Sequence, residues 1–211
     1  VGVDGARPNA THCALAELER AGKIDLLITQ NVDRLHQKAG SQRVVDLHGR
    51  LDQVICLNCG KQKSRKTFQT RLVQANPFVT DYQHIARPDG DADVPDTYVE
   101  KITTPQCELC GGVVMPDVVF FGGTVPRARV EACTESLASA GGLLVVGSSL
   151  QVYSGFRFCR VAEKLRIPIV IVNEGETRAD DMATLKVEQS AMNRLVAAID
   201  QIIPSQESKS A

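Results

Sequence analysis

Two Cys-x-x-Cys pairs carry the clearest chemical signal in this sequence of 211 residues. Cys56 and Cys59 form the first pair, Cys107 and Cys110 form the second, and a glycine follows each pair. Two residues between thiolates let both sulfurs of a tight turn face one tetrahedral ion, so the four thiolates predict one zinc site. Four thiolates leave zinc no open position, and the metal is therefore predicted to be structural. A redox dithiol and two unrelated buried pairs are the alternatives.

Polar turns of small residues follow three apolar segments of strand length. The segments are 24–29, 143–146 and 168–172, and the turns after them are Gln30-Asn31-Val32-Asp33, Gly147-Ser148-Ser149 and Asn173-Glu174-Gly175. Ligands in open α/β sheets bind where parallel strands end, and backbone N–H groups in such turns suit phosphates. The turns together predict a nucleotide site, although Asn31 or Asp33 alone could simply cap a helix, and Gly147-Ser148-Ser149 alone could be a turn with a serine cap.

His48 is the candidate for acid–base chemistry. It follows the alternating, strand-like run 44–47 and precedes Gly49, which leaves room beside the ring. An imidazole can accept a proton near neutral pH, so His48 could serve as a general base. A structural or surface role is the alternative reading of a single histidine.

The elements that must position these residues alternate between strands and helices. Helical periodicity and capping residues predict helices at 11–21, 127–139, 152–165 and 190–203. Continuous apolar runs predict buried parallel strands at 24–29, 118–121, 143–146 and 168–172. A strand, a helix and a strand within about 30 residues make a βαβ unit. The sequence therefore predicts an α/β fold, a Rossmann-like doubly wound parallel sheet.

The pattern changes between residues 51 and 115, where both cysteine pairs, a basic stretch at 61–66 and many turn residues lie. We interpret this segment as a small zinc-binding module inserted into the sheet domain. The predicted organisation is a first part of the core at 1–50, the zinc-binding module at 51–115, a second part of the core at 116–204 and a tail at 205–211.

Composition excludes several classes of protein. A net charge of −1 gives no broad attraction to nucleic acid or anionic membranes, and no apolar stretch is long enough to span a bilayer. Seven cysteines without a visible secretory leader favour a reducing, intracellular compartment. The basic stretch 61–66 leaves open a zinc-ribbon module that binds partners without catalysis.

Taken together, the motifs resemble the sirtuins, most closely the class II branch. The residues that carry the resemblance are Thr29-Gln30-Asn31-Val32-Asp33, Leu35-His36, Ala39-Gly40, Leu47-His48-Gly49, the two cysteine pairs, the run from Pro116 to Gly122, Gly147-Ser148-Ser149-Leu150 and Asn173. The resemblance covers 8–203. It implies NAD-dependent removal of acyl groups from protein lysine, with release of nicotinamide and transfer of the acyl group to ADP-ribose.

The resemblance also implies roles for individual residues. By this resemblance, His48 would be the general base that helps to deprotonate a ribose hydroxyl. Asn31, Val32 and Asp33 fall at the nicotinamide pocket and Gln30 near its ribose. Gly147, Ser148 and Ser149 fall at the ribose-phosphate turn, while Asn173, Glu174, Gly175 and Ala191 fall at the adenosine end. Val119 and Phe120 would belong to the strand that pairs with an acylated-lysine peptide.

Two departures from the sirtuin pattern affect these expectations. The Gly-rich phosphate-binding strand of the family would precede Val1, so the chain resembles an N-terminally truncated member that we expect to bind NAD weakly and to be inactive alone. Gly123 stands where relatives commonly carry an acidic residue.

Protein ADP-ribosyl transfer from the same site is the alternative activity. The expected compartment is the cytoplasm of a bacterium or the mitochondrial matrix of a eukaryote, and the sequence predicts no oligomeric state.

Overall fold

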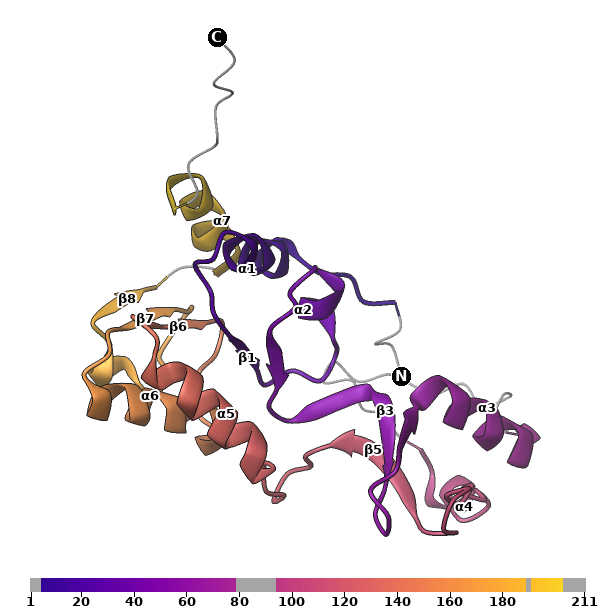
Figure 1. Cartoon of the computed structure of the whole chain (residues 1–211). Coiled ribbons are helices and arrows are strands. Elements are labelled where there is room, and N and C mark those ends of the chain that lie inside the picture. The colour runs from indigo at the N-terminus through magenta and orange to yellow at the C-terminus, as the bar shows by residue number, and fades with distance from the viewer. Residues whose placement is uncertain (1–4, 79–93, 189–190, 203–211) are drawn as a thin grey trace. The chain divides into compact units, whose positions relative to one another are not determined.

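The structure, a computed structural model, describes residues 5–78, 94–188 and 191–202 (Figure 1). The chain divides into two compact units. The cysteine unit comprises 1–6, 31–34 and 48–121, and the layered unit comprises 7–30, 35–47 and 122–211. The domain boundaries predicted from the sequence stay a proposal, and the tail at 205–211 lies outside the described residues.

Parallel strands form the centre of the layered unit. Strand β1 (Leu27–Thr29) pairs in parallel with β2 (Val44–Asp46). Strands β6 (Leu143–Val146), β7 (Ile169–Val172) and β8 (Leu185–Val187) form a second parallel sheet in that order. This parallel α/β arrangement confirms the fold class predicted from the sequence. Among the described strands, β1 bonds only to β2, and β6 bonds only to β7.

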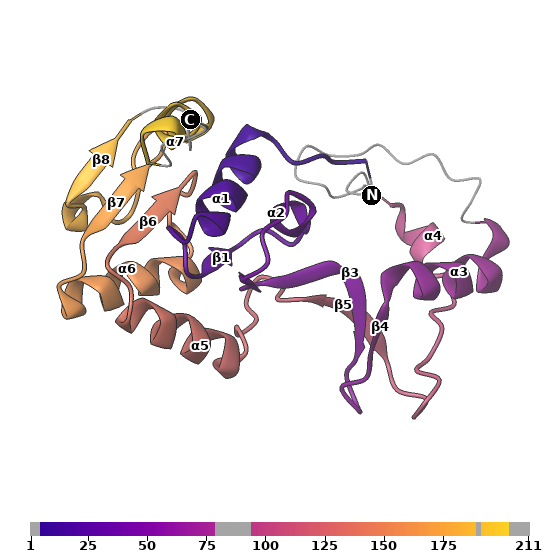
Figure 2. The ribbon, with the colours of Figure 1, turned by 45° about the horizontal axis from the view of Figure 1, so that its top comes forward.

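Helices cover both faces of these strands. Helices α1 (Ala10–Arg20) and α7 (Ala191–Ile202) lie side by side, as do α5 (Arg127–Ala138) and α6 (Tyr153–Leu165) (Figure 2). Successive strand residues join different apolar clusters, because strand side chains alternate between faces. Val145 packs in the cluster that contains Phe156 of α6, whereas Val146 packs against the cluster that contains Leu18 of α1. Each of the four helices predicted from periodicity is present, with its ends shifted by one residue or none at each predicted boundary.

A short helix, the N-terminal cap of α1 and a 3₁₀ turn complete the layered unit. Helix α2 (Leu35–Lys38) connects β1 to β2. The side chain of Asn9 accepts a hydrogen bond from the backbone N–H of His12 at 3.1 Å, which caps α1 at its first turn. A 3₁₀ turn (Asp180–Met182) lies between β7 and β8.

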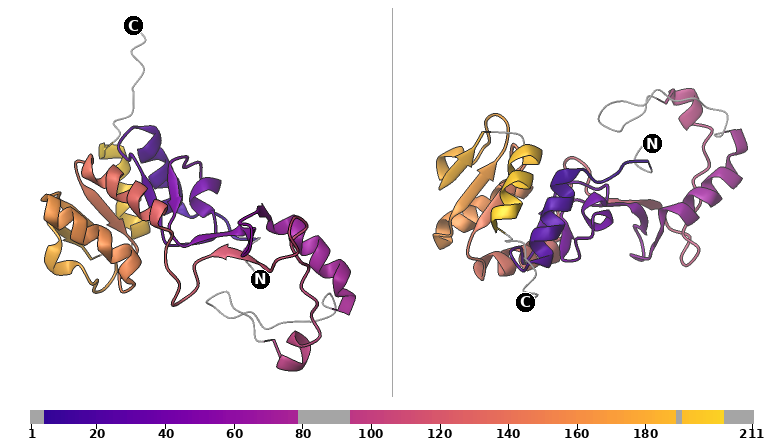
Figure 3. Two further views of the ribbon diagram at one scale, coloured as in Figure 1. Left: turned by 60° about the horizontal axis from the view of Figure 1, so that its bottom comes forward. Right: turned by 90° about the horizontal axis from the view of Figure 1, so that it is seen from above.

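The cysteine unit is built on an antiparallel sheet. Strands β4 (Gln62–Ser64), β3 (Gly49–Cys56) and β5 (Val114–Val118) are hydrogen-bonded in that order. Helix α3 (Arg65–Ala75) follows β4, and the short helix α4 (Asp96–Val99) comes later in the chain (Figure 3). The basic stretch 61–66 therefore supplies β4 and the start of α3.

The prediction of a buried parallel strand at 118–121 was wrong. The strand at this place is β5, which ends at Val118 and pairs antiparallel with β3. Phe120 and Phe121 follow it and are exposed, Phe121 completely. A continuous apolar run is typical of a strand covered on both faces, but here the run continues beyond the sheet into an exposed segment.

Candidate functional site

The four cysteines of the predicted zinc site come from two matching turns of the cysteine unit. Cys56 ends β3, and the N–H of Gly60 bonds to its carbonyl at 3.0 Å. The second turn repeats this bond, because the N–H of Gly111 donates to the carbonyl of Cys107 at 2.8 Å. Both glycines adopt positive φ, 69° and 70°, a conformation that costs glycine little.

The sulfur atoms are arranged as a zinc ion requires. All four Sγ atoms lie within 4.8 Å of one another, with Cys56 and Cys110 at 3.5 Å and Cys59 and Cys107 at 3.8 Å. Tetrahedral zinc with bonds of about 2.3 Å to sulfur sets its ligands about 3.8 Å apart. The cluster therefore fits one structural zinc ion, as its spacing in the sequence predicts.

The thiols of this cluster differ in how readily they ionise. Hydrogen bonds from the backbone N–H groups of Leu109 and Cys110 lower the pKa of Cys107 to about 6. The N–H of Gly112 lowers the pKa of Cys110, but the Cys59 and Cys56 sulfurs together raise it to about 12. Four thiolates repel one another at this distance, so a divalent cation would offset their charge and release the remaining protons.

His48 is held by the backbone of the same unit. The N–H of Val119 donates to the carbonyl of His48 at 2.8 Å, and Gly49 next to it opens β3. A Cβ on Gly49 would lie 2.1 Å from the carbonyl oxygen of Asp117, and its φ is +87°. Only glycine fits where β3 and β5 approach so closely, and this approach fixes the backbone of His48, whose side chain is half-buried.

The segment Asn31–Arg34 belongs to the same compact unit as His48. The carbonyl of Val32 accepts a hydrogen bond from the N–H of Leu51 in β3 at 2.9 Å. Arg34 adopts a left-handed backbone with φ 65°, and its Nε lies 3.9 Å from the carboxylate of Asp52. Asn31 is exposed and Asp33 half-buried. The structure therefore anchors the predicted nicotinamide-pocket residues to the strand that begins beside His48.

In the layered unit, Gln30 joins two turns that are far apart in the sequence. Its Nε2 donates to the Oγ of Ser148 at 2.9 Å across a separation of 118 residues. The same Oγ accepts from the N–H of Leu150 at 3.3 Å. A Cβ on Gly155, in the first turn of α6, would lie 2.8 Å from the Gln30 carboxamide. The turns after β1 and β6 therefore meet as predicted.

Gly155 was missed by the sequence analysis. Glycine inside a helix costs about 1 kcal/mol relative to alanine, so a packing reason was to be expected for it. Here the missing side chain makes room for Gln30.

The turns after β6 and β7 both present open, left-handed glycines. Gly147 has φ 58° and Gly175 has φ 76°, and neither has an atom within 4 Å of where a Cβ would stand. Asn173 is buried, and its amide donates to the carbonyls of Glu174 at 2.8 Å and Gly175 at 3.3 Å. Small exposed turns of this kind leave room for a ligand to approach the backbone.

The remaining predicted site residues keep their assignments as predictions. Ser149 and Glu174 are exposed in their turns, and Phe120 is exposed beside the half-buried Val119. Ala191 begins α7, but its side chain lies outside the described residues.

No helix in the described part of the chain is long and apolar enough to cross a membrane.

Comparison with known proteins identifies the relatives of this chain. Residues 3–154 match the family model described as the Sir2 family. An "NAD-dependent protein deacetylase" of Xanthomonas axonopodis pv. citri is 55% identical over 190 residues, which cover 90% of this chain and 65% of that protein. The "NAD-dependent protein lipoamidase sirtuin-4, mitochondrial" of Bos taurus is 47% identical over 92% of this chain and 61% of its own length. The chain thus spans less than two thirds of both relatives.

Solved structures agree with these matches. The structure described as "Sir2-p53 peptide-NAD+" superposes with a TM-score of 0.74 at 30% identity, over 93% of this chain and 71% of that one. The structure "Sir2 bound to acetylated peptide" gives a TM-score of 0.73 at 30% identity, with the same coverage.

Proposed function

The chain belongs to the Sir2 family, and from this premise we propose that the protein carrying it is an NAD-dependent protein lysine deacylase of the deacetylase type. The observation that carries the proposal is the 55% identity to an NAD-dependent protein deacetylase over 90% of this chain. The residues that match the family model, 3–154, include the turns after β1 and β6, His48 and the cysteine cluster.

The turns of the layered unit would hold the adenosine and phosphate side of NAD. The Ser148 Oγ already accepts two hydrogen bonds, from Gln30 and Leu150, so its own proton is directed toward another acceptor. A ribose or phosphate oxygen is such an acceptor. Gly147, Ser149, Asn173, Glu174, Gly175 and Ala191 complete the proposed contact set.

The residues on the cysteine unit would act on the reacting end of NAD. Bound NAD supplies a ribose carbon that becomes electrophilic as nicotinamide leaves. Asn31, Val32 and Asp33 would line the nicotinamide pocket, and the Asp33 carboxylate would offset the positive charge that develops on the ribose.

His48 would act as the general base. An imidazole can take up the proton of a ribose hydroxyl, and the bond from the Val119 N–H fixes the backbone that carries this imidazole. Val119 and the exposed Phe120 would contact the acylated-lysine peptide just beyond β5. The zinc ion would stabilise the cysteine unit and take no part in the reaction.

The proposal needs no nucleic acid or membrane as a partner. The cysteines of the chain are free, which fits a reducing compartment such as the bacterial cytoplasm or the mitochondrial matrix.

The test uses the natural gene product that carries this chain, an acetyl-lysine peptide and NAD. We expect nicotinamide and free lysine to form together, and the His48→Ala variant to lose this activity while it keeps its bound zinc and its melting temperature. A peptide that keeps its acetyl group and gains ADP-ribose would support the transferase alternative. Zinc binding without any consumption of NAD would instead support a non-catalytic module.

A further inference from the structure

We propose that Arg178 is a positioning residue that ties together the two turns of the layered unit, after β6 and after β7. This inference rests on the proposed function, because it assigns those turns to NAD. Arg178 does not belong to any predicted turn or strand, and its role emerges only from its contacts. All of these contacts lie within the layered unit.

The first contacts reach backward along the chain to the turn after β6. The N–H of Arg178 donates to the carbonyl of Ser149 at 2.9 Å, and its Nη1 donates to the carbonyl of Gln151 at 3.1 Å. The two acceptors flank Leu150, which is buried and has a left-handed backbone with φ 56°. A left-handed backbone costs a leucine about 1–2 kcal/mol, so it persists only where its neighbours are held. Arg178 holds both neighbours.

Two aromatic rings lie close to the guanidinium group of Arg178. Its Cζ lies 4.3 Å from the ring centroid of Phe156 and 6.0 Å from that of Tyr153, both in the first turn of α6. Phe156 is buried and belongs to the apolar core. A planar guanidinium can stack on a ring and still donate sideways to a carbonyl, which an ammonium group cannot match.

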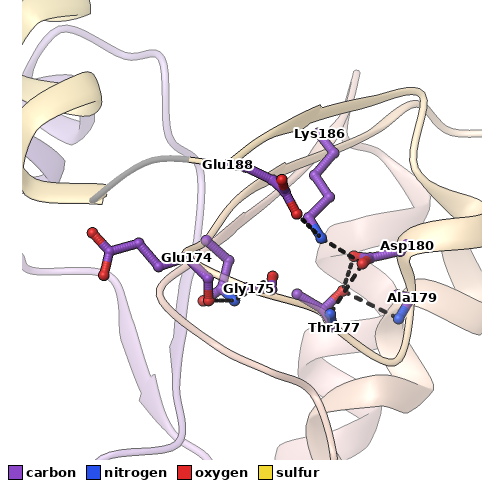
Figure 4. A network of polar contacts seen from close by, with 8 residues as sticks. Glu174, Gly175, Thr177, Ala179, Asp180, Lys186 and Glu188 are labelled. Carbon is purple, nitrogen blue, oxygen red and sulfur yellow. Dashed lines mark hydrogen bonds and ion pairs between the residues drawn. The ribbon is translucent and has the colours of Figure 1, made fainter.

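The residues on either side of Arg178 are anchored as well (Figure 4). The Asp180 carboxylate accepts from the N–H of Thr177 at 3.1 Å and from its hydroxyl at 2.5 Å. The same carboxylate pairs with the Nζ of Lys186 in β8 at 2.5 Å. The Thr177 hydroxyl oxygen in turn accepts from the N–H of Ala179 at 3.3 Å. The backbone that carries Arg178 is thereby fastened to β8.

These contacts connect the turn after β6 to the turn after β7. The turn after β7 leads directly into the anchored segment 177–180, and Arg178 extends from that segment to the turn after β6. Loss of the side chain removes one of the two bonds to the turn after β6 and the stacking on α6. Ser148 and Ser149 should then sample positions that NAD cannot use, and affinity for NAD should fall without a change in the chemistry.

The experiment compares Arg178→Met and Arg178→Lys with the control Arg160→Met, an exposed position on α6. In the natural gene product we expect Arg178→Met to raise the KM for NAD about 10-fold, which corresponds to the loss of one hydrogen bond of a charged donor. The kcat should stay within about 3-fold, and the KM for the acetyl-peptide should not change. Arg178→Lys, which keeps the charge without the planar fork, should restore less than half of the loss in affinity.

A second measurement follows the exchange of backbone amide hydrogens in the turn after β6, in the absence of NAD. Hydrogen–deuterium exchange of a peptide covering 147–152 should be faster in Arg178→Met than in the wild type and in Arg160→Met. An unchanged KM for NAD, or unchanged exchange, would overturn the positioning role. If the wild type does not consume NAD at all, the proposed function fails, and exchange alone decides whether Arg178 holds the turn. The Lys variant replaces the Met variant in both measurements if the latter does not fold.

Discussion

Replacing Gly49 with alanine tests how the backbone beside His48 is held. The new Cβ would lie 2.1 Å from the carbonyl oxygen of Asp117 and 2.9 Å from the Cα of Val118. Carbon and oxygen ordinarily approach to about 3.3 Å, so β3 and β5 would have to separate by about 1 Å. The φ of +87° adds about 1–2 kcal/mol for a residue with a Cβ, and overpacking adds about 1–3 kcal/mol.

The sum is a destabilisation of about 2–5 kcal/mol. In a domain of about 100 residues each kcal/mol lowers the melting temperature by about 4–8 °C, so Gly49→Ala should lower it by about 10 °C or more. Gly60→Ala is the matched control, because Gly60 lies in the same unit with φ +69° and has no atom within 4 Å of the new Cβ. Differential scanning calorimetry of both variants separates the steric cost from the backbone cost. Equal losses of stability in the two variants would refute the reasoning.

Three further predictions concern the metal, an ion pair and a helical glycine. Removing zinc with a chelator should unfold the cysteine unit. Binding of a structural zinc ion contributes about 10–16 kcal/mol to folding, whereas the free energy of unfolding of a whole domain is only about 5–15 kcal/mol. Circular dichroism should show the loss of secondary structure and its recovery when zinc is added back. The hydrogen bond from Lys186 lowers the pKa of Asp180 to about 2 from its usual 3.8, so this carboxylate stabilises the fold above about pH 4 and less as the pH falls toward 2. The stability gap between wild type and Asp180→Asn, measured by urea unfolding, should therefore shrink between pH 4 and pH 2, with Asp181→Asn at the exposed neighbouring position as the control. Gly155→Ala should displace the Gln30 carboxamide and raise the KM for NAD several-fold with little effect on folding; an unchanged KM would show that Gln30 is not needed in this position.

The zinc site could be predicted from the sequence because it depends on local geometry. A Cys-x-x-Cys-Gly turn places its own two sulfurs, and two such turns need only meet to complete a tetrahedron. The helices could be predicted for a similar reason, since their periodicity lies within each segment. Asn9, for example, is of a residue type that commonly caps helices, and it caps α1 in the structure.

Features set by contacts between distant segments were harder to predict. The apolar run at 118–121 looks like a buried strand. The pairing of β5 with β3 ends at Val118, however, and Phe121 is fully exposed. The role of Gly155 depends on the Gln30 side chain, and that of Arg178 on carbonyls 27 or more residues away. The segment Asn31–Arg34 follows β1 in the chain, yet it belongs to the compact unit of β3, which only the folded chain reveals.

The most direct test of the proposed function is a mass balance on the natural gene product with an acetyl-lysine peptide. One nicotinamide and one acetylated ADP-ribose should form for each lysine released, as measured by quantitative mass spectrometry, and none should form in His48→Ala. Lysine released with free acetate while NAD stays intact would contradict the account.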